Sequence, residues 1–284
     1  MKNKHPLEYP SLNKSYKGLF PFKICTTSFI YPDHYIPNVK MLGPCVDEIE
    51  LLLFESRGVD SIPSKVVVAE LGQLAREFDL TYNVHLPTDV SITDPDPTRQ
   101  KSAVETMVQV IERVQPLCPS ALVLHLPYNE PSFTRQNRVI WQNSVYKNLG
   151  KILSAVENNN LIAIETLDYS PELLADIIVD LDLAICLDLG HLMVYDYDVL
   201  EVYNKYASVA SVLHLHGVEN RRDHTTLERL SAESFEPVRR VLAEFTGVVS
   251  IEVFSFENLD SSLKYLERHW KQNLAWIPYL NKVK

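Results

Sequence analysis

Eight short apolar segments, rich in Leu and β-branched residues, recur along the chain. Their apolar runs are nearly continuous rather than alternating, which is typical of parallel strands covered on both faces. The segments span residues 23–30, 46–54, 80–87, 121–128, 161–168, 183–191, 211–218 and 247–255. The pattern therefore predicts eight buried strands.

Segments with helical periodicity lie between several of these strands, at residues 61–78 and 96–114, and another follows the last strand at residues 258–270. The first has Ser61 and Pro63 as its predicted start signal. In the segment 170–180, Ser170 can cap the first turn and Pro171 suits the first helical position. Strands that alternate with helices indicate an α/β fold. The count of eight, without a GxGxxG motif after the first strand, favours a closed (β/α)8 TIM barrel over a doubly wound sheet.

The length of 284 residues suits a single domain, because α/β barrels of about 250 residues commonly form one domain. We expect residues 1–21 to form a polar leader and residues 22–284 to form the barrel with its C-terminal tail. No Gly/Ser-rich linker or low-complexity segment divides the chain. The tail contains Trp276 and Tyr279, which we expect to pack against the barrel.

The composition, 46% hydrophobic and 23% charged, is that of an ordinary globular protein, and the formal net charge is −10. This acidic balance argues against a nucleic-acid substrate, because phosphate backbones are bound through clustered Lys and Arg. The sequence contains neither the apolar region of a signal peptide nor a run long enough to span a membrane. The four cysteines lack CxxC spacing and suit reduced thiols. We expect a cytoplasmic protein with a small-molecule substrate and no membrane span.

Side chains that bind metals gather at the ends of the predicted strands. Six of the nine histidines lie at or just beyond a strand end, and four carboxylates accompany them. Because the active site of a TIM barrel forms at the C-terminal ends of its strands, we expect these side chains to meet. They are His85, His125, His191, His214, His216, His224, Glu165, Asp188, Asp223 and Glu252.

A single His or Glu near a strand end is more often a hydrogen-bonded residue of the core or rim than a metal ligand. Convergence of so many imidazoles and carboxylates favours metal binding, because buried charges are costly unless they are paired or metal-bound. Imidazoles and carboxylates are the ordinary ligands of Zn²⁺ and, with more oxygen ligands, of Mn²⁺ or Fe²⁺. The sequence therefore predicts a divalent metal centre.

This residue set resembles the xylose-isomerase-like TIM-barrel superfamily, which includes endonuclease IV and sugar epimerases. The resemblance runs over residues 22–273 and includes Ile-Glu-Thr around Glu165 and Asp-x-x-His from Asp188 to His191. In the endonuclease IV branch the matching positions bind up to three metals. The resemblance thus implies two or three divalent ions per chain, with Zn²⁺ as the first choice and Mn²⁺ or Fe²⁺ as alternatives.

The resemblance also implies roles for individual residues. Glu165 and Glu252 would bridge neighbouring ions. His85 and His125 would bind one ion, and Asp188 would bind a second ion together with a histidine of the seventh strand.

Two positions depart from the pattern of that branch. Either His214 or His216 could be the histidine of the seventh strand, and we place His216 first. His191, His224 and Asp223 would bind the third ion. Asp223 and His224 are adjacent here, whereas the endonuclease branch separates this acid and histidine by one residue.

Within the superfamily, the motifs TTSFIYP, YNVHLPTD, LHLPYNEP, CLDLGHL and HLHGVENRRDH together resemble the cobamide-remodelling phosphodiesterases. This resemblance implies a metal-dependent hydrolase that cuts the nucleotide-loop phosphodiester of a cobamide, leaving cobinamide phosphate and a riboside. Glu165 and Glu252 would act at the metals, and Arg222 would clamp a phosphate oxygen unless it is merely a solvated loop residue. A corrinoid also needs an aromatic rim, for which the sequence offers Tyr31, Tyr128, Tyr169, Tyr195 and Phe256.

Three alternatives stay open. A sugar isomerase or epimerase on the same barrel would use one metal, with Glu165 and Glu252 moving a proton beside a carbonyl group. Such a site has little need of His85, His125 and His224. An apurinic endonuclease would share the metal ligands, but the acidic net charge weighs against it. A non-catalytic barrel that binds a corrinoid or a sugar is the third alternative.

Overall fold

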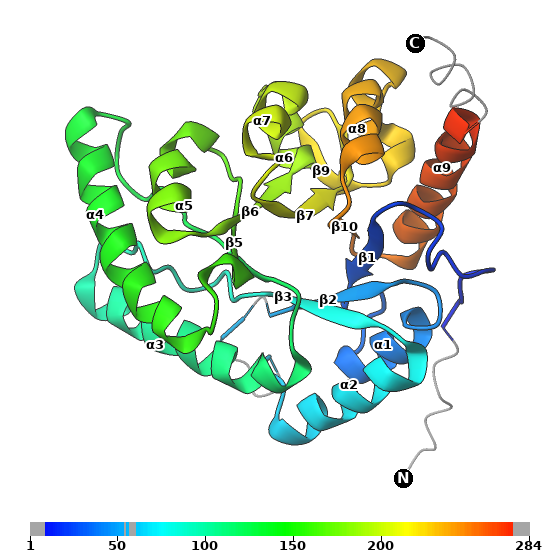
Figure 1. Ribbon diagram of the computed structural model, residues 1–284, viewed down its shortest axis with the longest axis horizontal. Coiled ribbons are helices and arrows are strands. Elements are labelled where there is room, and N and C mark those ends of the chain that lie inside the picture. Colours follow the sequence, from blue (N-terminus) through cyan, green and yellow to red (C-terminus); the bar gives the residue numbers. More distant parts are fainter. Residues whose placement is uncertain (1–8, 54, 57–60, 275–284) are drawn as a thin grey trace.

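Eight parallel strands form a closed barrel, which confirms the predicted (β/α)8 TIM-barrel fold. The structure is a computed structural model that describes residues 9–53, 55–56 and 61–274, without the side chains of 271–274. The strands surround the centre of the molecule in the order β1-β10-β7-β6-β5-β4-β3-β2 (Figure 1). Their bounds are β1 Lys23–Thr27, β2 Glu48–Leu52, β3 Thr81–His85, β4 Leu122–Leu124, β5 Ile162–Glu165, β6 Ala184–Asp188, β7 Ala210–Leu215 and β10 Val248–Ile251.

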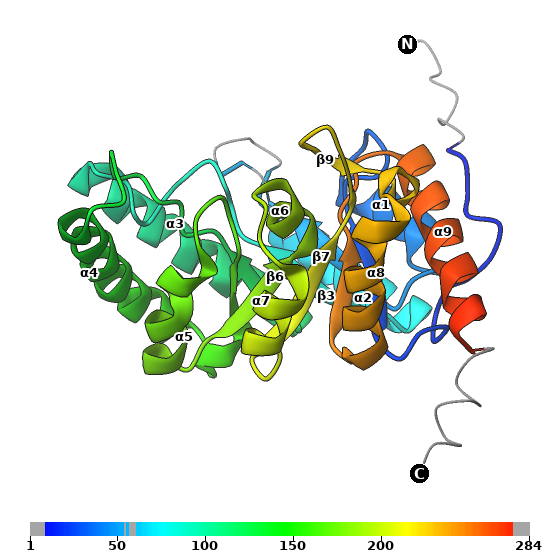
Figure 2. The same cartoon turned by 90° about the horizontal axis from the view of Figure 1, so that it is seen from above.

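Helices lie outside the barrel and bury the outer face of its strands (Figure 1). Figure 2 shows α3 and α4 at one end of the molecule and α9 at the other. The helices are α1 Tyr35–Leu42, α2 Lys65–Phe78, α3 Pro97–Val114, α4 Arg135–Ile152, α5 Ala175–Leu181, α6 Leu189–Val194, α7 Val199–Tyr206, α8 Ala232–Glu244 and α9 Phe256–Leu274.

Two predicted helix starts can be compared with the structure. Helix α2 begins at Lys65, and its cap is Ser64, whose hydroxyl accepts from the amide of Val67 at 3.3 Å, so the start predicted at Ser61 is wrong. Ser170 does cap the next predicted segment, but the first turn, Pro171–Leu174, is a 3₁₀ helix that continues into α5.

A short antiparallel hairpin follows β7 and was not predicted from the sequence. Its strands are β8 Gly217–Glu219 and β9 Arg222–Thr225. The two residues between them, Asn220 and Arg221, have φ values of 53° and 62°, as the tight turns that suit hairpin twist require. The hairpin lies on the upper side of the ribbon in Figure 2. It carries His224, which lies near His191 and His216, and Asp223, whose Oδ2 lies 4.0 Å from His191 Nε2.

The expected leader packs on the barrel where it is described, because Leu12, Tyr16 and Phe20 are buried in the main hydrophobic core. The expected contacts of Trp276 and Tyr279 lie outside the described residues. No helix in the described part of the chain has the length and apolar character needed to cross a membrane.

Strand register aligns the residues that bear the chemistry. Asp188 pairs with His214 across β6 and β7, and Ser250 pairs with His214 across β7 and β10. Glu165 and Asp188 are the last residues of β5 and β6, and Glu252 directly follows β10. These side chains therefore emerge at the same end of the barrel.

Candidate metal centre

Four buried side chains from four strands form the centre of the site, and we call them the four-residue group: Glu165, Asp188, His214 and Glu252. One ligand atom from each lies within 4.8 Å of those of the other three. His214 Nδ1 lies 3.1 Å from Glu252 Oε2, 3.6 Å from Glu165 Oε1 and 3.8 Å from Asp188 Oδ2. Three carboxylates and one imidazole thus surround one small volume.

Two atoms of the four-residue group fit a cation directly. His214 Nδ1 and Glu252 Oε2 are buried, and within the described part of the chain neither makes a hydrogen bond. Leaving a buried polar atom without a partner costs about 1–3 kcal/mol. A divalent cation coordinated by both atoms would satisfy them, and mixed oxygen and imidazole donors suit Zn²⁺, Mn²⁺ or Fe²⁺.

The other oxygen of Glu165 faces two further histidines. Glu165 Oε2 lies 3.0 Å from His85 Nε2 and 2.9 Å from His125 Nε2. His85 Nδ1 lies 3.0 Å from the carbonyl oxygen of Leu86, to which it can donate. Ligand atoms of His85, His125 and Glu165 also lie within 4.8 Å of one another. Glu165 therefore stands between two groups of potential ligands.

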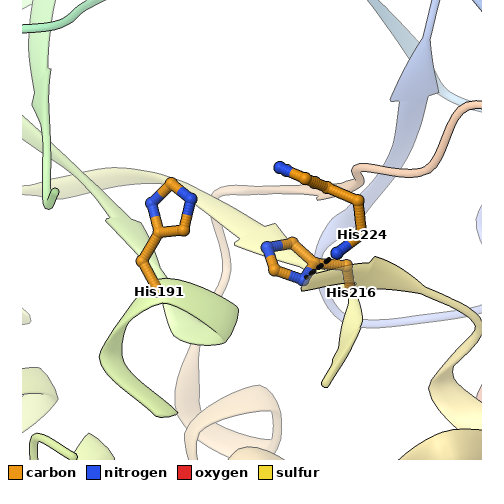
Figure 3. A group of neighbouring side chains, drawn as sticks. All are labelled: His191, His216 and His224. Carbon is orange, nitrogen blue, oxygen red and sulfur yellow. Dashed lines mark hydrogen bonds between the residues drawn. The ribbon is translucent and has the colours of Figure 1, made fainter. Parts of the chain in front are cut away.

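A third group consists of His191, His216 and His224, which we call the three-histidine group. Their rings converge in Figure 3, and one nitrogen of each lies within 4.8 Å of the others. Nδ1 of His191 lies 3.1 Å from the carbonyl oxygen of Thr166, and Nδ1 of His224 lies 3.2 Å from that of Glu252. Donation through Nδ1 leaves Nε2 of both rings as the acceptor for a cation.

His216 connects this group to the four-residue group. Its Nδ1 accepts a hydrogen bond from the amide of His224 at 3.0 Å (Figure 3). Its Nε2 lies 3.1 Å from Asp188 Oδ1. The ring packs so closely on α6 that a Cβ at Gly190 would lie 1.9 Å from its Cε1. Residue 190 must therefore lack a side chain for His216 to take this place.

The imidazoles and carboxylates of these groups shift one another's pKa values. Burial alone would lower the pKa of His85 and His191, but the neighbouring carboxylates outweigh it and raise each pKa to about 9. Burial alone would raise the pKa of Glu165 and Asp188, but adjacent imidazoles hold both below their usual range. The described part of the chain places no Lys or Arg in an ion pair with either carboxylate. Protonated imidazoles thus balance these acids, and a bound cation would replace their protons.

The structure brings together nearly all of the predicted site residues. The six histidines, Glu165, Asp188 and Glu252 lie within the three groups. Asp223 lies beside them, with Oδ2 at 4.0 Å from His191 Nε2. His214 lies in the four-residue group, and His216 lies in the three-histidine group with its Nε2 3.1 Å from Asp188 Oδ1. The ligand roles themselves stay predictions.

Three residues that we predicted to contact the substrate lie outside these groups of ligands. Arg222 is exposed at the start of β9. Tyr31 and Tyr169 are buried and donate to the carbonyl oxygens of Pro10 and Leu126, so they do not form an exposed aromatic rim.

One contact of the site was missed. Glu50, inside the apolar run of β2, lies 3.0 Å from His214 Nε2 through its Oε1. The two residues are 164 positions apart, and nothing in the local sequence pattern of either strand indicates that they meet.

Residues 39–280 match the model of a protein family described as xylose isomerase-like TIM barrel. The chain belongs to the xylose isomerase-like TIM-barrel family. The predicted superfamily, and membership of an enzyme family, are thereby confirmed. No curated protein matches the chain.

Several solved structures share this xylose isomerase-like fold. A D-tagatose 3-epimerase-like protein is 18% identical with a TM-score of 0.73, and the match covers 90% of this chain and 100% of that one. An L-ribulose 3-epimerase is 15% identical with a TM-score of 0.71, covering 93% and 99% of the two chains. D-Psicose 3-epimerase from Clostridium cellulolyticum H10 is 15% identical with a TM-score of 0.64, covering 91% and 99%.

These neighbours overturn the predicted activity. The three structures named above are two sugar 3-epimerases and one epimerase-like protein, which contradicts a phosphodiesterase acting on a cobamide and favours the alternative of a sugar isomerase or epimerase. The prediction of a hydrolase is therefore wrong. The phosphate clamp assigned to Arg222 and the corrinoid substrate lose their basis with it.

Proposed function

We propose that the protein is a metal-dependent sugar isomerase or epimerase that acts on a ketose. The observation that supports this most is the four-residue group, in which the carboxylates of Glu165 and Glu252 share one small volume with Asp188 and His214. Two carboxylates beside one cation site are what proton transfer next to a sugar carbonyl requires. The sugar epimerases of similar fold support the same class of reaction.

Glu165, Asp188, His214 and Glu252 would bind the cation of this reaction. A divalent cation bound there supplies a Lewis acid that polarises the carbonyl group and makes the neighbouring C–H more acidic. Zn²⁺ is our first choice, with Mn²⁺ or Fe²⁺ as alternatives.

The two glutamates would perform the proton transfer. One carboxylate, ionised, takes the proton from the carbon beside the carbonyl, and the C–H electron pair passes into the enediolate. The other, protonated, returns a proton to the opposite face of that carbon, which inverts its configuration. Each turnover leaves the two protonation states exchanged, and proton exchange with solvent restores them. His85 and His125, both bonded to Glu165 Oε2, would orient its carboxylate.

We also propose that the site binds two or three ions in all, more than the one metal that we expected of a sugar epimerase, because further groups of potential ligands adjoin the four-residue group. The three-histidine group would bind one of them through His191, His216 and His224, with Asp223 as a further ligand. His85 and His125 would bind another together with Glu165, their Nε2 atoms then coordinating the ion in place of their hydrogen bonds to Glu165 Oε2, and Glu165 would bridge two ions. Total metal analysis of the purified protein, per chain, measures this number.

Product analysis tests the proposed function. Protein loaded with Zn²⁺ or Mn²⁺ is incubated separately with D-tagatose, D-psicose and L-ribulose, and C3 epimers and aldose isomers are separated by chromatography. We expect a new sugar from at least one of these ketoses, and none after chelation of the metal.

Matched variants show whether the glutamates are responsible. Glu252→Gln removes one proton carrier and should abolish conversion. Glu257→Gln is the same substitution at an exposed position of α9 and should leave conversion unchanged. Failure of every ketose to react, or full activity of Glu252→Gln, would refute the proposed function.

A further inference from the structure

We propose that Glu50 is a positioning residue for the cation site, because it holds the imidazole of His214 with Nδ1 directed at the carboxylates. The inference depends on the cation site of the proposed function, although not on the sugar. It assigns a role to a carboxylate that contacts a proposed ligand of the cation, His214, and is not itself a proposed ligand.

The contact crosses the inside of the barrel. Glu50 lies on β2 and His214 on β7, strands that are not neighbours in the barrel. Both side chains are fully buried, and Glu50 Oε1 lies 3.0 Å from His214 Nε2. The other oxygen, Oε2, accepts a hydrogen bond from the hydroxyl of Ser250 at 2.6 Å. Glu50 is therefore held in place from β10 while it faces the ring on β7.

This contact decides which nitrogen of His214 carries the proton. An ionised carboxylate only accepts hydrogen bonds, so Nε2 must donate to Glu50. A neutral imidazole has one N–H, and Nδ1 is then left with its lone pair. Nδ1 is the atom that lies 3.1 Å from Glu252 Oε2 and makes no hydrogen bond among the described residues.

Without Glu50 the opposite tautomer would be favoured. Nδ1–H could donate to Glu252, and the ring would then present no lone pair to a cation. A carboxylate behind a ligating histidine also makes the ring a stronger donor, and loss of such a partner typically weakens metal affinity by about 10- to 100-fold.

Glu48 provides an internal comparison. It lies two residues earlier on β2 and is likewise fully buried. Its carboxylate accepts hydrogen bonds from Asn83 Nδ2 at 3.0 Å and from the hydroxyls of Thr81 and Ser120. None of these partners is a proposed cation ligand. A role for Glu50 that was only structural would make the two glutamates equivalent.

The direct test is an NMR measurement of the imidazole nitrogens of His214 in protein labelled with ¹⁵N-histidine, assigned with His214→Gln. In the wild type, loaded with Zn²⁺ and without any sugar, we expect a proton on Nε2 and none on Nδ1. A proton on Nδ1 would overturn the inference without any variant of Glu50.

Matched variants supply the second measurement. In Glu50→Gln the amide can turn either its oxygen or its NH₂ toward Nε2, so the proton position is no longer imposed. We expect Zn²⁺ affinity, measured by competition with a chelator, to fall by about 10- to 100-fold, and Glu48→Gln to change it by less than about 3-fold. Equal effects of the two variants, or unchanged affinity in Glu50→Gln, would overturn the inference. Because neither measurement includes a sugar, a protein that passes both yet converts no ketose would refute only the proposed function.

Discussion

Removing bound cations and then raising the pH should destabilise the folded protein. His85 lies against Glu165, and its pKa rises from the ordinary 6.5 to about 9 because the carboxylates around it outweigh the effect of burial. Below pH 6.5 the native and unfolded chains both hold this proton, and its stabilising contribution is fully present. Between pH 6.5 and about 9 only the native chain holds it, so stability falls as the pH rises.

The size of the effect follows from the shift. The difference between 6.5 and about 9 is about 2.5 units, and each unit corresponds to 1.36 kcal/mol, so His85 alone contributes about 3 kcal/mol. Its side chain is almost fully buried, so solvent does not screen the interaction. His191 shifts in the same direction, but it shares Glu165 with His85, so the two contributions do not simply add. A loss of about 3 kcal/mol is a large part of the 5–15 kcal/mol that stabilises a typical domain.

Urea unfolding in excess chelator, followed by circular dichroism at pH 6.5, 8 and 9.5, measures how the stability of the metal-free protein changes with pH. We expect the urea concentration at the midpoint of unfolding to fall steadily from pH 6.5 to pH 9.5. Saturating Zn²⁺ should reverse the trend, since the cation competes with protons for the same imidazoles. His85→Gln should flatten the dependence in chelator, and His34→Gln, at an exposed position, should leave it unchanged. A midpoint that stays constant or rises in chelator would refute the reasoning.

Two substitutions test other parts of the site. Gly190→Ala would place a Cβ 1.9 Å from His216 Cε1, and because carbon atoms pack at about 3.5–4 Å the ring must move by roughly 2 Å. Metal analysis should then show one ion fewer per chain. Gly150→Ala, where nothing lies within 4 Å of the added Cβ, should bind as many ions as the wild type. His125→Ala should keep the far-ultraviolet circular dichroism of a folded barrel and lose ketose conversion, because Glu165 Oε2 loses one of its two imidazole partners, and His34→Ala should be fully active. Equal metal content in the two glycine variants would contradict the expected loss of an ion in Gly190→Ala. Ketose conversion by His125→Ala would contradict the expected loss of activity.

The strands of the barrel could be predicted because they are buried on both faces, but their ends could not. Leu53, Leu86 and Leu126 come after the ends of β2, β3 and β4 and are still buried, so the apolar run continues after the strand has ended. Helix α4 gave little signal, because Val139 and Ile140 are exposed on the face opposite its buried residues.

The residues that form the site could be predicted, but which of them contact one another could not. Strand ends in a TIM barrel converge, so histidines and acids at those ends were expected to meet. Whether His214 or His216 joins Asp188 and Glu252 depends on where β7 ends and where the hairpin turns. Glu50 could not be found at all, because its partner is distant in sequence and an acid within an apolar run carries no signal of its own.

Deuterium exchange is the most direct measurement of the central claim, that Glu165 and Glu252 exchange a proton at carbon beside a bound cation. Metal-loaded protein is incubated with each ketose in D₂O, and the C–H signals beside the carbonyl are followed by ¹H NMR. We predict that deuterium enters at C3 or C1 of at least one ketose in the wild type, and at neither carbon in the chelated protein or in Glu252→Gln. Absence of exchange from every ketose in the loaded wild type, or undiminished exchange in Glu252→Gln, would contradict the account.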